Sequence, residues 1–397
     1  MGGVSMEWKE VRLGDIADVQ TGPFGSQLHK SDYIAEGIPC IMPTNIGPHL
    51  NFIVDGIAHV SEVDANRLSR HLTEIGDIIY ARRGDIEKCA YVTTNEEKWL
   101  CGTGCLKIRC NNEVNSRFIA YLLSTAECKK WITGNAVGTT MLNLSKGILS
   151  NLPLLVPSHE DQRRIASILS SLDRKIELNN KINADLEEMA QAIFKNWFVD
   201  FEPFKDGKLV DSELGMIPEG WKVGSLGDFC NVFTGKKNTN QAIEKGLYPF
   251  FSCAPEPLAS NDAIFNGKAI IIAGNGSYTG RTSFYNGGFD LYQRTYACTI
   301  REQDKENLMI FFYHMMKQFF EPTKMGGTRG SSIPYIVMGD ITQQKFPYSE
   351  DWLIRFSNIV NSMMDRKLRI DKENSRLSLL RDTLLPRLMS GELEVPE

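Results

Sequence analysis

The chain has 397 residues, of which 42% are hydrophobic and 23% charged, the ordinary composition of a soluble globular protein. That length exceeds one ordinary domain and suits two domains of about 150 residues with further helices. The net charge of −5 excludes a protein that holds nucleic acid through bulk positive charge, although a local basic face is compatible with it. Because no apolar run reaches the ~18 residues of a membrane span, and MGGVSMEWKE lacks a signal-peptide core, we expect no membrane anchor and a cytoplasmic location.

Cysteine usage points to a reducing compartment. The chain has nine cysteines, an odd number. Cys101, Cys105 and Cys110 lie close in sequence, flanked by Cys89 and Cys128, but no Cys-x-x-Cys pair occurs and no histidine completes a familiar zinc spacing. We therefore expect buried free thiols rather than a metal site.

The opening of the chain returns later in the sequence. Trp8-Lys9, Leu13-Gly14-Asp15 and Thr21-Gly22 match Trp221-Lys222, Leu226-Gly227-Asp228 and Thr234-Gly235 at an offset of 213. Later matches fall at 192: Ile108-Arg109 with Ile300-Arg301, Tyr121 with Tyr313, and Gly138-Thr139-Thr140 with Gly330-Ser331-Ser332. The second copy is thus 21 residues shorter, and the missing piece lies between Gly22 and Gly76. An internal duplication follows, with a period far longer than a solenoid repeat.

Within each copy the local patterns are mixed. Short apolar runs leaving glycine turns predict strands at residues 76–81, 106–109, 268–273 and 297–300, and longer apolar runs predict helices at 118–123 and 310–320. Glycine-rich loops join them. We predict α+β domains with functional loops, and a polar connector over residues 200–220.

A long helix is predicted after each copy. Ser158, with Asp161 three residues on, is a capping signal, and the helix to residue 198 is about 60 Å long at 1.5 Å rise per residue. A heptad seam runs along it through Ile165, Leu169, Leu172, Ile176, Asn179, Asn183, Leu186, Ala190, Ile193 and Trp197. The second helix repeats a seam through Phe356, Met363, Ile370, Leu377 and Leu384, with a second row at Val360, Asn374, Leu380 and Leu388.

The two helices are expected to pair antiparallel as a coiled coil, because neither can bury its seam alone. Asp173-Arg174-Lys175 returns as Asp365-Arg366-Lys367, again at 192, which gives the chain a pseudo-two-fold plan. The seam asparagines indicate either a register device, in which Asn179 or Asn183 meets Asn374, or a solvated gap. Trp197, Phe198, Leu384, Leu385 and Leu388 suit either seam core or patches for another subunit.

These predictions divide the chain into four parts. They are a first α+β domain over residues 1–157, a central helix over 158–200, a connector with the second domain over 201–347, and a C-terminal helix and tail over 348–397. Met6 is an alternative first residue of the natural chain, with residues 1–5 added.

No catalytic motif stands out. The chain has no phosphate-binding loop, no His-Glu-x-x-His and no nucleophile elbow, and Gly274-x-Gly276-x-x-x-Gly280 misses the dinucleotide spacing. A carboxylate pair has no spacing signature, so it stays open. Metal, catalytic and cofactor residues are therefore not assigned to this chain.

Polar and basic residues instead recur beside glycines at matching loop positions of both copies. Such side chains read base edges and phosphates, although loops are also polar simply because they are loops. The candidate DNA-binding residues are Ser26, Gln27, His29, Lys30, Arg82, Arg83, Thr139, Thr140 and Asn143 in the first copy, and Lys236, Lys237, Asn238, Asn240, Tyr278, Arg281, Arg294, Arg329, Ser331 and Ser332 in the second.

The sequence closely resembles the DNA-specificity subunits of Type I restriction-modification systems. The resemblance spans essentially the whole chain and includes WKEVRLGDIADVQTGPFGS, GIPCIMPTNI, PSHEDQRRIASILSSLDRKIE, AIFKNWFVDFEPF, ELGMIPEGW and LLRDTLLPRLMSGELEV. It implies two target-recognition domains, each reading half of a bipartite double-stranded DNA target, on antiparallel helices that dock two methyltransferase subunits. A translocating nuclease subunit would join them, and S-adenosylmethionine, Mg²⁺ and ATP would belong to the partners.

One departure between the copies bears on this role. Ile333-Pro334-Tyr335-Ile336 stands where the first copy has Met141-Leu142-Asn143-Leu144, so the loop tips are expected to read different bases. If the helix pair acts as a ruler, about one added turn changes the gap between half-sites. The competing hypotheses are a self-contained restriction or modification enzyme with an unrecognised active site, and a scaffold whose repeated domains bind protein.

Overall fold

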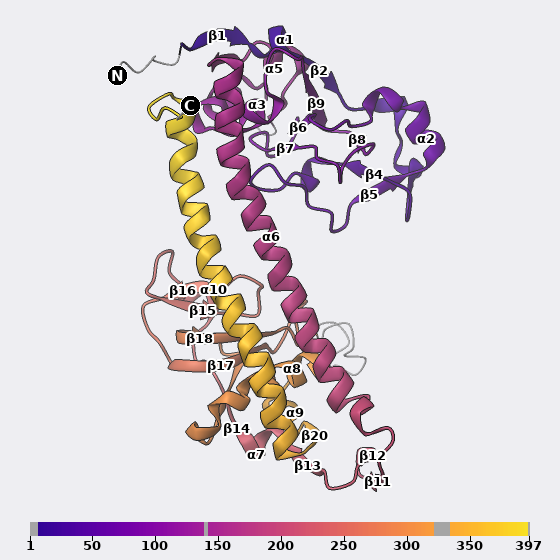
Figure 1. Cartoon of the computed structure of the whole chain (residues 1–397), viewed down its shortest axis with the longest axis vertical. Helices are drawn as coiled ribbons and strands as arrows, with labels where there is room; N and C mark the ends of the chain where they lie inside the picture. The colour runs from indigo at the N-terminus through magenta and orange to yellow at the C-terminus, as the bar shows by residue number, and fades with distance from the viewer. Residues whose placement is uncertain (1–6, 139–141, 321–333, 396–397) are drawn as a thin grey trace. The chain divides into compact units, whose positions relative to one another are not determined.

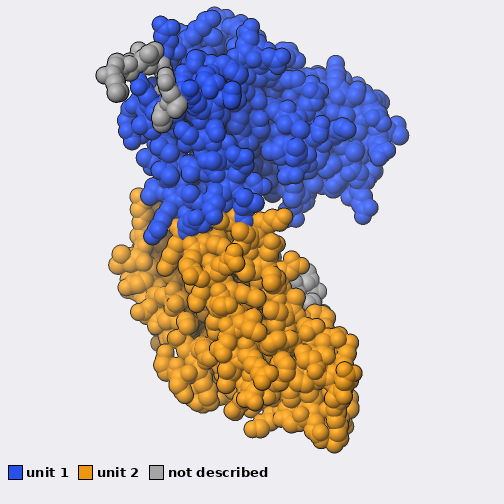
Figure 2. Space-filling model, viewed as in Figure 1, with its two compact units in different colours: residues 1–178, 373–397 blue, residues 179–372 orange. Residues whose placement is uncertain are grey.

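The computed structural model describes residues 7–138, 142–320 and 334–395 of the chain. It divides into two compact units, each built around one copy of the repeat (Figure 2). Unit 1 comprises residues 1–178 and 373–397, and unit 2 comprises residues 179–372. Because both boundaries fall inside a long helix, each unit combines an α+β body with part of both helices.

The described residues of unit 1 form three small sheets. A β-ladder joins β1 (Lys9–Arg12) to β10 (Pro153–Val156), and a central sheet has the order β2-β9-β6-β7. The central strands are β2 (Ala17–Thr21), β6 (Ile78–Ala81), β7 (Cys89–Tyr91) and β9 (Cys105–Cys110). The third sheet, in the order β3-β5-β4-β8, uses β3 (Tyr33–Ile34), β4 (Ile38–Ile41), β5 (Ala58–Val60) and β8 (Leu100–Cys101).

Short helices surround these sheets (Figure 1). They are α1 (Leu13–Ile16), α2 (Glu62–Arg67), α3 (Ser116–Leu123), α4 (Ala126–Asn135) and α5 (Lys146–Ser150), with 3-10 turns at Gly25–Gln27, Lys30–Asp32, Pro43–Asn45 and Ser69–His71. Asn115 and Thr125 cap α3 and α4 through their side chains. All the side chains of α3 from Phe118 onward are buried, so α3 joins the central sheet to the core.

Unit 2 repeats this plan. β13 (Lys222–Ser225) pairs with β20 (Lys345–Tyr348), and a six-stranded sheet has the order β14-β19-β17-β18-β15-β16. Its strands are β14 (Cys230–Thr234), β15 (Tyr248–Phe251), β16 (Leu258–Ser260), β17 (Phe265–Ala273), β18 (Thr282–Leu291) and β19 (Thr295–Ile300). The helices are α7 (Leu226–Phe229), α8 (Met309–Phe320) and α9 (Met338–Thr342), with 3-10 turns at Glu202–Phe204, Thr239–Gln241 and Gln303–Leu308.

The expected strands and helices are confirmed, and the connector proves more ordered than its sequence indicates. It forms the hairpin β11 (Leu209–Ser212) and β12 (Gly215–Pro218).

The strand registers correct one alignment of the two copies. Val19 faces Ile108 and its counterpart Val232 faces Cys298, so Ile108 matches Cys298 rather than Ile300. The segments that follow these strands differ in length by two residues, which restores the offset of 192 at Tyr121 and Tyr313.

The two long helices have nearly the expected bounds, α6 at His159–Phe198 and α10 at Glu350–Met389. Ser158 caps α6: the backbone N–H of Asp161 donates to its hydroxyl at 3.2 Å, and that hydroxyl donates to the Asp161 carboxylate at 2.7 Å. In unit 1, Lys175 of α6 pairs with Glu373 of α10 at 3.3 Å, and Asp173 pairs with Arg381 at 3.2 Å. Residue numbers rise along one helix as they fall along the other, so the pairing in this unit is antiparallel.

In unit 2 the same two helices pair through aromatic rings. The ring centroids of Trp197 and Trp352 lie 4.9 Å apart, and those of Phe194 and Phe356 lie 5.9 Å apart. The helices are therefore antiparallel in this unit as well. Phe198 is buried within this cluster, as Leu388 is in the core of unit 1, so these residues are core rather than subunit patches. Asn183 is buried and donates to Asp371 at 2.6 Å, which favours a register role and gives it a partner other than the expected Asn374.

The seam prediction for α10 needs one correction. Leu380 is 46% exposed, whereas its neighbour Arg381 is 4% exposed. Counting heptads from Val360 and Asn374 reaches residue 381, so a charged side chain occupies the buried seam position. The other seam residues are buried or half-buried: Ile165, Leu169, Leu172, Ile176, Asn179, Asn183, Leu186, Ile193, Phe356, Met363, Ile370, Asn374, Leu377 and Leu384.

His314 places a titratable group inside the core of unit 2. Its side chain is fully buried, Nδ1 lies 2.9 Å from Gln191 Oε1, and Nε2 has no partner among the described residues. Burial lowers the pKa of His314 to about 4; Glu187 opposes this shift and Lys317 adds to it. The folded protein therefore keeps this imidazole neutral while the unfolded chain, at an ordinary pKa near 6.5, takes up a proton.

We predict that His314→Gln removes part of the loss of stability in acid. Stability from a depressed histidine pKa falls as pH drops from about 6.5 toward 4, by up to roughly 3 kcal/mol, and changes no further below that. Free energies of unfolding at pH 7, 6 and 5 test this, with His29→Gln at an exposed position as the control. The same slope in wild type and His314→Gln would contradict it.

The nine cysteines are free thiols, seven of them buried. Burial raises the pKa of Cys40, Cys89 and Cys101 to about 12, so these groups are protonated, unreactive core residues. Among the described residues, no helix is both long and apolar enough to cross a membrane.

Candidate nucleic-acid interface

Three loops of unit 1 meet at one edge of the central sheet. β2 and β6 end there and β9 begins there, so their loops are neighbours. The turn before β9 is the meeting point: Gly22 N–H donates to Cys105 O at 3.0 Å, and Arg82 N–H donates to Gly104 O at 2.8 Å. A Cβ on Gly22 would lie 2.1 Å from Gly102 O, so only glycine allows this close approach.

A fourth segment is bound to the same place. The backbones of Arg83 and Asn143 form an isolated β-bridge, and Leu144 N–H donates to Arg82 O at 2.9 Å. The loop after β6 and the loop before α5 are thereby held together. We refer to residues 22–30, 82–84, 102–104 and 142–145 as the edge cluster of unit 1.

Unit 2 builds the same arrangement with other side chains. A Cβ on Gly235 would lie 1.7 Å from Leu291 O, and Gly274 N–H donates to Arg294 O at 2.9 Å. Asn275 bridges Tyr335, and Ile336 N–H donates to Gly274 O at 2.8 Å, as Leu144 does to Arg82 in the first copy. Residues 235–241, 274–281, 292–294 and 334–336 are the edge cluster of unit 2.

The described candidates of unit 1 lie on the loops that make up its edge cluster. Ser26, His29, Lys30 and Arg83 are exposed, and Gln27, Arg82 and Asn143 are half-buried. Burial and the neighbouring Arg83 lower the pKa of Arg82, which still leaves it charged. Thr139 and Thr140 lie outside the described residues, as do Arg329, Ser331 and Ser332 of the second copy.

The candidates of unit 2 fall into two groups. Lys236, Asn238, Asn240, Tyr278 and Arg294 are exposed at the edge cluster. Lys237 and Arg281 instead have internal partners. Lys237 Nζ lies 2.6 Å from Asp290 and 2.7 Å from Asp262, and Arg281 donates to the carbonyl oxygens of Pro255 and Ala254. These two side chains therefore hold neighbouring segments of the cluster together, and their contact with DNA stays a prediction.

Sequence patterns did not single out the central turn of unit 1, and in unit 2 they picked out Arg294 of that turn but not its neighbour Gln293. Thr103 donates to Pro23 O at 2.8 Å in unit 1, and Gln293, exposed in unit 2, donates to Asn238 Oδ1 at 2.6 Å. The glycines on either side of Thr103 were the available signal, because a Gly-x-Gly turn before a strand favours close backbone approach.

Comparison with known proteins identifies the class. The model of the Type I restriction modification DNA specificity domain matches residues 6–188 and 218–349. The Type I restriction enzyme MjaIX specificity subunit of Methanocaldococcus jannaschii is 27% identical over 100% of this chain and 96% of its own. The HindI specificity subunit of Haemophilus influenzae is 25% identical over 98% of this chain and 100% of its own.

A solved structure shares the fold. The S subunit of a Type I restriction-modification system from M. genitalium superposes with a TM-score of 0.62 at 17% identity, covering 97% of each chain. A repeated α+β body joined to long helices is thus an architecture that this chain shares with that S subunit. The chain belongs to the Type I restriction-modification DNA specificity family, and its role is that of a DNA sequence-recognition subunit.

Proposed function

We propose that each edge cluster reads one half of a bipartite DNA target. The observation that carries this proposal is the repeated construction: the same backbone contacts gather the same loops in both units, while the exposed side chains differ. Two domains that recognise different half-sites need the same backbone arrangement with different exposed side chains on its loops. Arg, Asn and Gln at the tips are the residue types that pair with base edges, and Lys and hydroxyl groups suit phosphates.

We further propose that α6 and α10 set the gap between the half-sites and dock two methyltransferase subunits. Large apolar side chains remain exposed on both helices: Leu178 and Met189 on α6, and Ile354, Leu368 and Leu379 on α10. Leu379 is the most exposed of these, at 70%. In this proposal they meet partner subunits, which supply the S-adenosylmethionine, Mg²⁺ and ATP chemistry, with a translocating nuclease subunit in the full complex. This chain is then non-catalytic.

Substituting one exposed arginine in each unit tests the proposal. Arg83→Ala and Arg294→Ala are each expected to relax one half-site, by about 1–3 kcal/mol of discrimination, while leaving the other unchanged. The measurement is methylation mapping of a sequence library by the complex reconstituted with its methyltransferase subunits. Lys205→Ala, exposed in the connector, is the charge-matched control and should keep the parental target.

Two outcomes would contradict the proposal. Methyl transfer or cleavage by this chain alone with DNA, Mg²⁺ and S-adenosylmethionine would favour a self-contained enzyme. If the affinity of the reconstituted complex for DNA depended on neither salt concentration nor DNA sequence, a protein-binding scaffold would be favoured. Recognition through phosphates weakens steeply as salt rises.

A further inference from the structure

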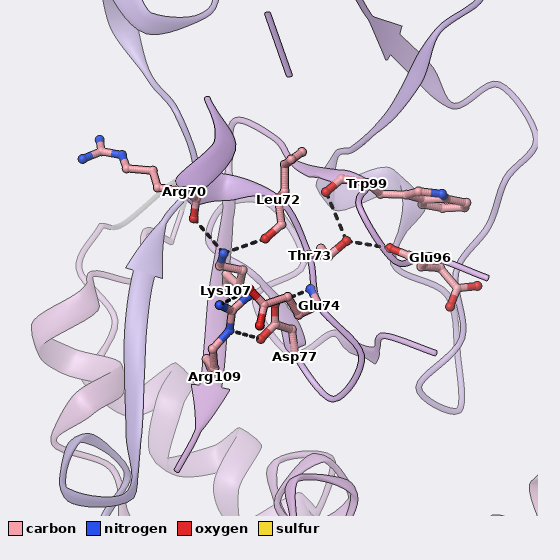
Figure 3. Close-up of polar contacts among 9 residues, drawn as sticks. All are labelled: Arg70, Leu72, Thr73, Glu74, Asp77, Glu96, Trp99, Lys107 and Arg109. Atoms are coloured by element: carbon pink, nitrogen blue, oxygen red, sulfur yellow. Dashed lines mark hydrogen bonds and ion pairs between the residues drawn. The ribbon is translucent and has the colours of Figure 1, made fainter. Parts of the chain in front are cut away.

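A buried lysine in unit 1 holds a segment that the second copy largely lacks. Lys107 of β9 is 4% exposed, yet its Nζ donates to Arg70 O and Leu72 O, each at 2.8 Å (Figure 3). Both carbonyls follow α2, in the region where the first copy is longer. Burying an ammonium group costs free energy unless its N–H donors find acceptors, and these two carbonyls supply them. The contact therefore fixes the position of that segment.

An ion pair fixes the same segment from its other side. Arg109 Nε and Nη2 each lie 2.7 Å from the Asp77 carboxylate, and Asp77 Oδ2 accepts from the backbone of Glu74 at 2.8 Å (Figure 3). The Asp77 side chain is only 1% exposed, whereas solvent reaches the pair from the Arg109 side, whose side chain is 39% exposed. Residues 70–74 are therefore anchored to strands β6 and β9 by two charged contacts.

The anchored segment reaches the edge cluster of unit 1. Arg67, at the end of α2, donates to Gln27 O at 3.0 Å, and its other Nη lies 2.7 Å from Asp64. Leu28 and Leu68 are buried in the same apolar cluster. Residues 67–72 thus link Lys107 to the loop carrying Ser26, Gln27 and His29.

In the described part of unit 2, other residues stand at these positions and a different anchor is present. The sheet registers place Ala297 at the position of Lys107, Thr299 at that of Arg109 and Ala269 at that of Asp77. The lysine instead lies in the corresponding loop itself. Lys237 Nζ bonds the Asp290 carboxylate at 2.6 Å and Ser260 Oγ at 3.1 Å, which ties residues 235–241 to β16 and β18.

We propose that Lys107 and Lys237 are positioning residues for sequence reading, each holding the first loop of its own edge cluster. Each lysine acts through a backbone or carboxylate contact and does not touch DNA. The inference rests on the proposed function and adds to it which lysine controls which half-site.

Half-site-resolved methylation mapping with the reconstituted complex tests this inference. Lys107→Met and Arg67→Ala are both expected to lower discrimination about tenfold at the same half-site, and Lys237→Met at the other one. Arg67→Ala removes the exposed contact between α2 and the Gln27 carbonyl and leaves Lys107 in place. It therefore keeps the test valid if Lys107→Met fails to fold. Lys9→Met, exposed on β1, is the control.

The results separate the inference from the proposed function. If wild-type methylation does not depend on this chain, the proposed function fails. If wild type reads a bipartite target but folded Arg67→Ala and Lys237→Met keep the parental preference at both half-sites, the inference is overturned. An equal loss at both half-sites would also overturn it, because it would show a general effect on stability.

Discussion

Adding one heptad to both long helices is expected to widen the gap between the two half-sites while leaving each half-site sequence unchanged. The insertions belong between Leu178 and Asn179 in α6 and between Lys372 and Glu373 in α10, where both helices pass from one unit to the other. Seven residues add about 10 Å of helix, comparable to roughly three base pairs. Methylation mapping measures the gap directly.

The sites of insertion spare the contacts inside each unit. The Lys175–Glu373 pair stays within unit 1 and the Asn183–Asp371 bond within unit 2, and a whole heptad keeps the seam in phase. The matched control inserts the heptad in α6 alone, which is expected to break the helix pairing and lower activity rather than produce a new gap. A paired insertion that returned the parental gap would refute the role of the helices as a ruler.

Much of the architecture is predictable from the sequence because its signals are long and repeated. The heptads of α6, its Ser158 cap and the offset Trp-Lys and Thr-Gly patterns led to paired helices and duplicated bodies. The matching glycines at positions 22 and 235 also indicated a repeated structural feature, because at both positions a strand end approaches a neighbouring turn closely.

Other features depend on contacts that no local pattern reveals. The sequence predicts Lys237 and Arg281 to be exposed loop cations. In the structure they bind acceptors tens of residues away in sequence, such as the Asp290 carboxylate and the Pro255 carbonyl. The match of Ile108 to Ile300 failed because sheet register, not letter identity, determines which residues share a position. Arg381 was missed because apolar periodicity selects Leu380 beside it.

Arg381 carries the second large prediction. Its Nη1 lies 3.2 Å from Asp173 Oδ1, and Nη2 lies 3.3 Å from His49 Nε2. Asp173 also accepts from the Tyr121 hydroxyl. Burial and, next, the nearby Arg381 lower the pKa of His49, so its neutral ring can accept from the guanidinium. His49 and Leu50 both have left-handed backbones, with φ of 55° and 62°, a strained pair that these contacts help to hold.

Arg381→Met is expected to destabilise unit 1 by roughly 3–5 kcal/mol, because it leaves the Asp173 carboxylate buried without a counter-charge. Adding Asp173→Asn to this variant should recover much of the loss, since the amide keeps an acceptor for Tyr121 and carries no charge. Arg387→Met is the control: its pair with Glu392 is at 3.0 Å, but both side chains are exposed.

Denaturant unfolding of the reconstituted complex and of the chain alone gives the free energies, and a double-mutant cycle gives the coupling between positions 381 and 173. The control is expected to change stability by less than about 1 kcal/mol. If Arg381→Met and Arg387→Met cost the same, or if Asp173→Asn brings no recovery, the buried pair is not what couples α10 to the body of unit 1. Recovery by Asp173→Asn would show that the cost arises from the orphaned charge rather than from lost packing, because the asparagine restores no part of the arginine side chain.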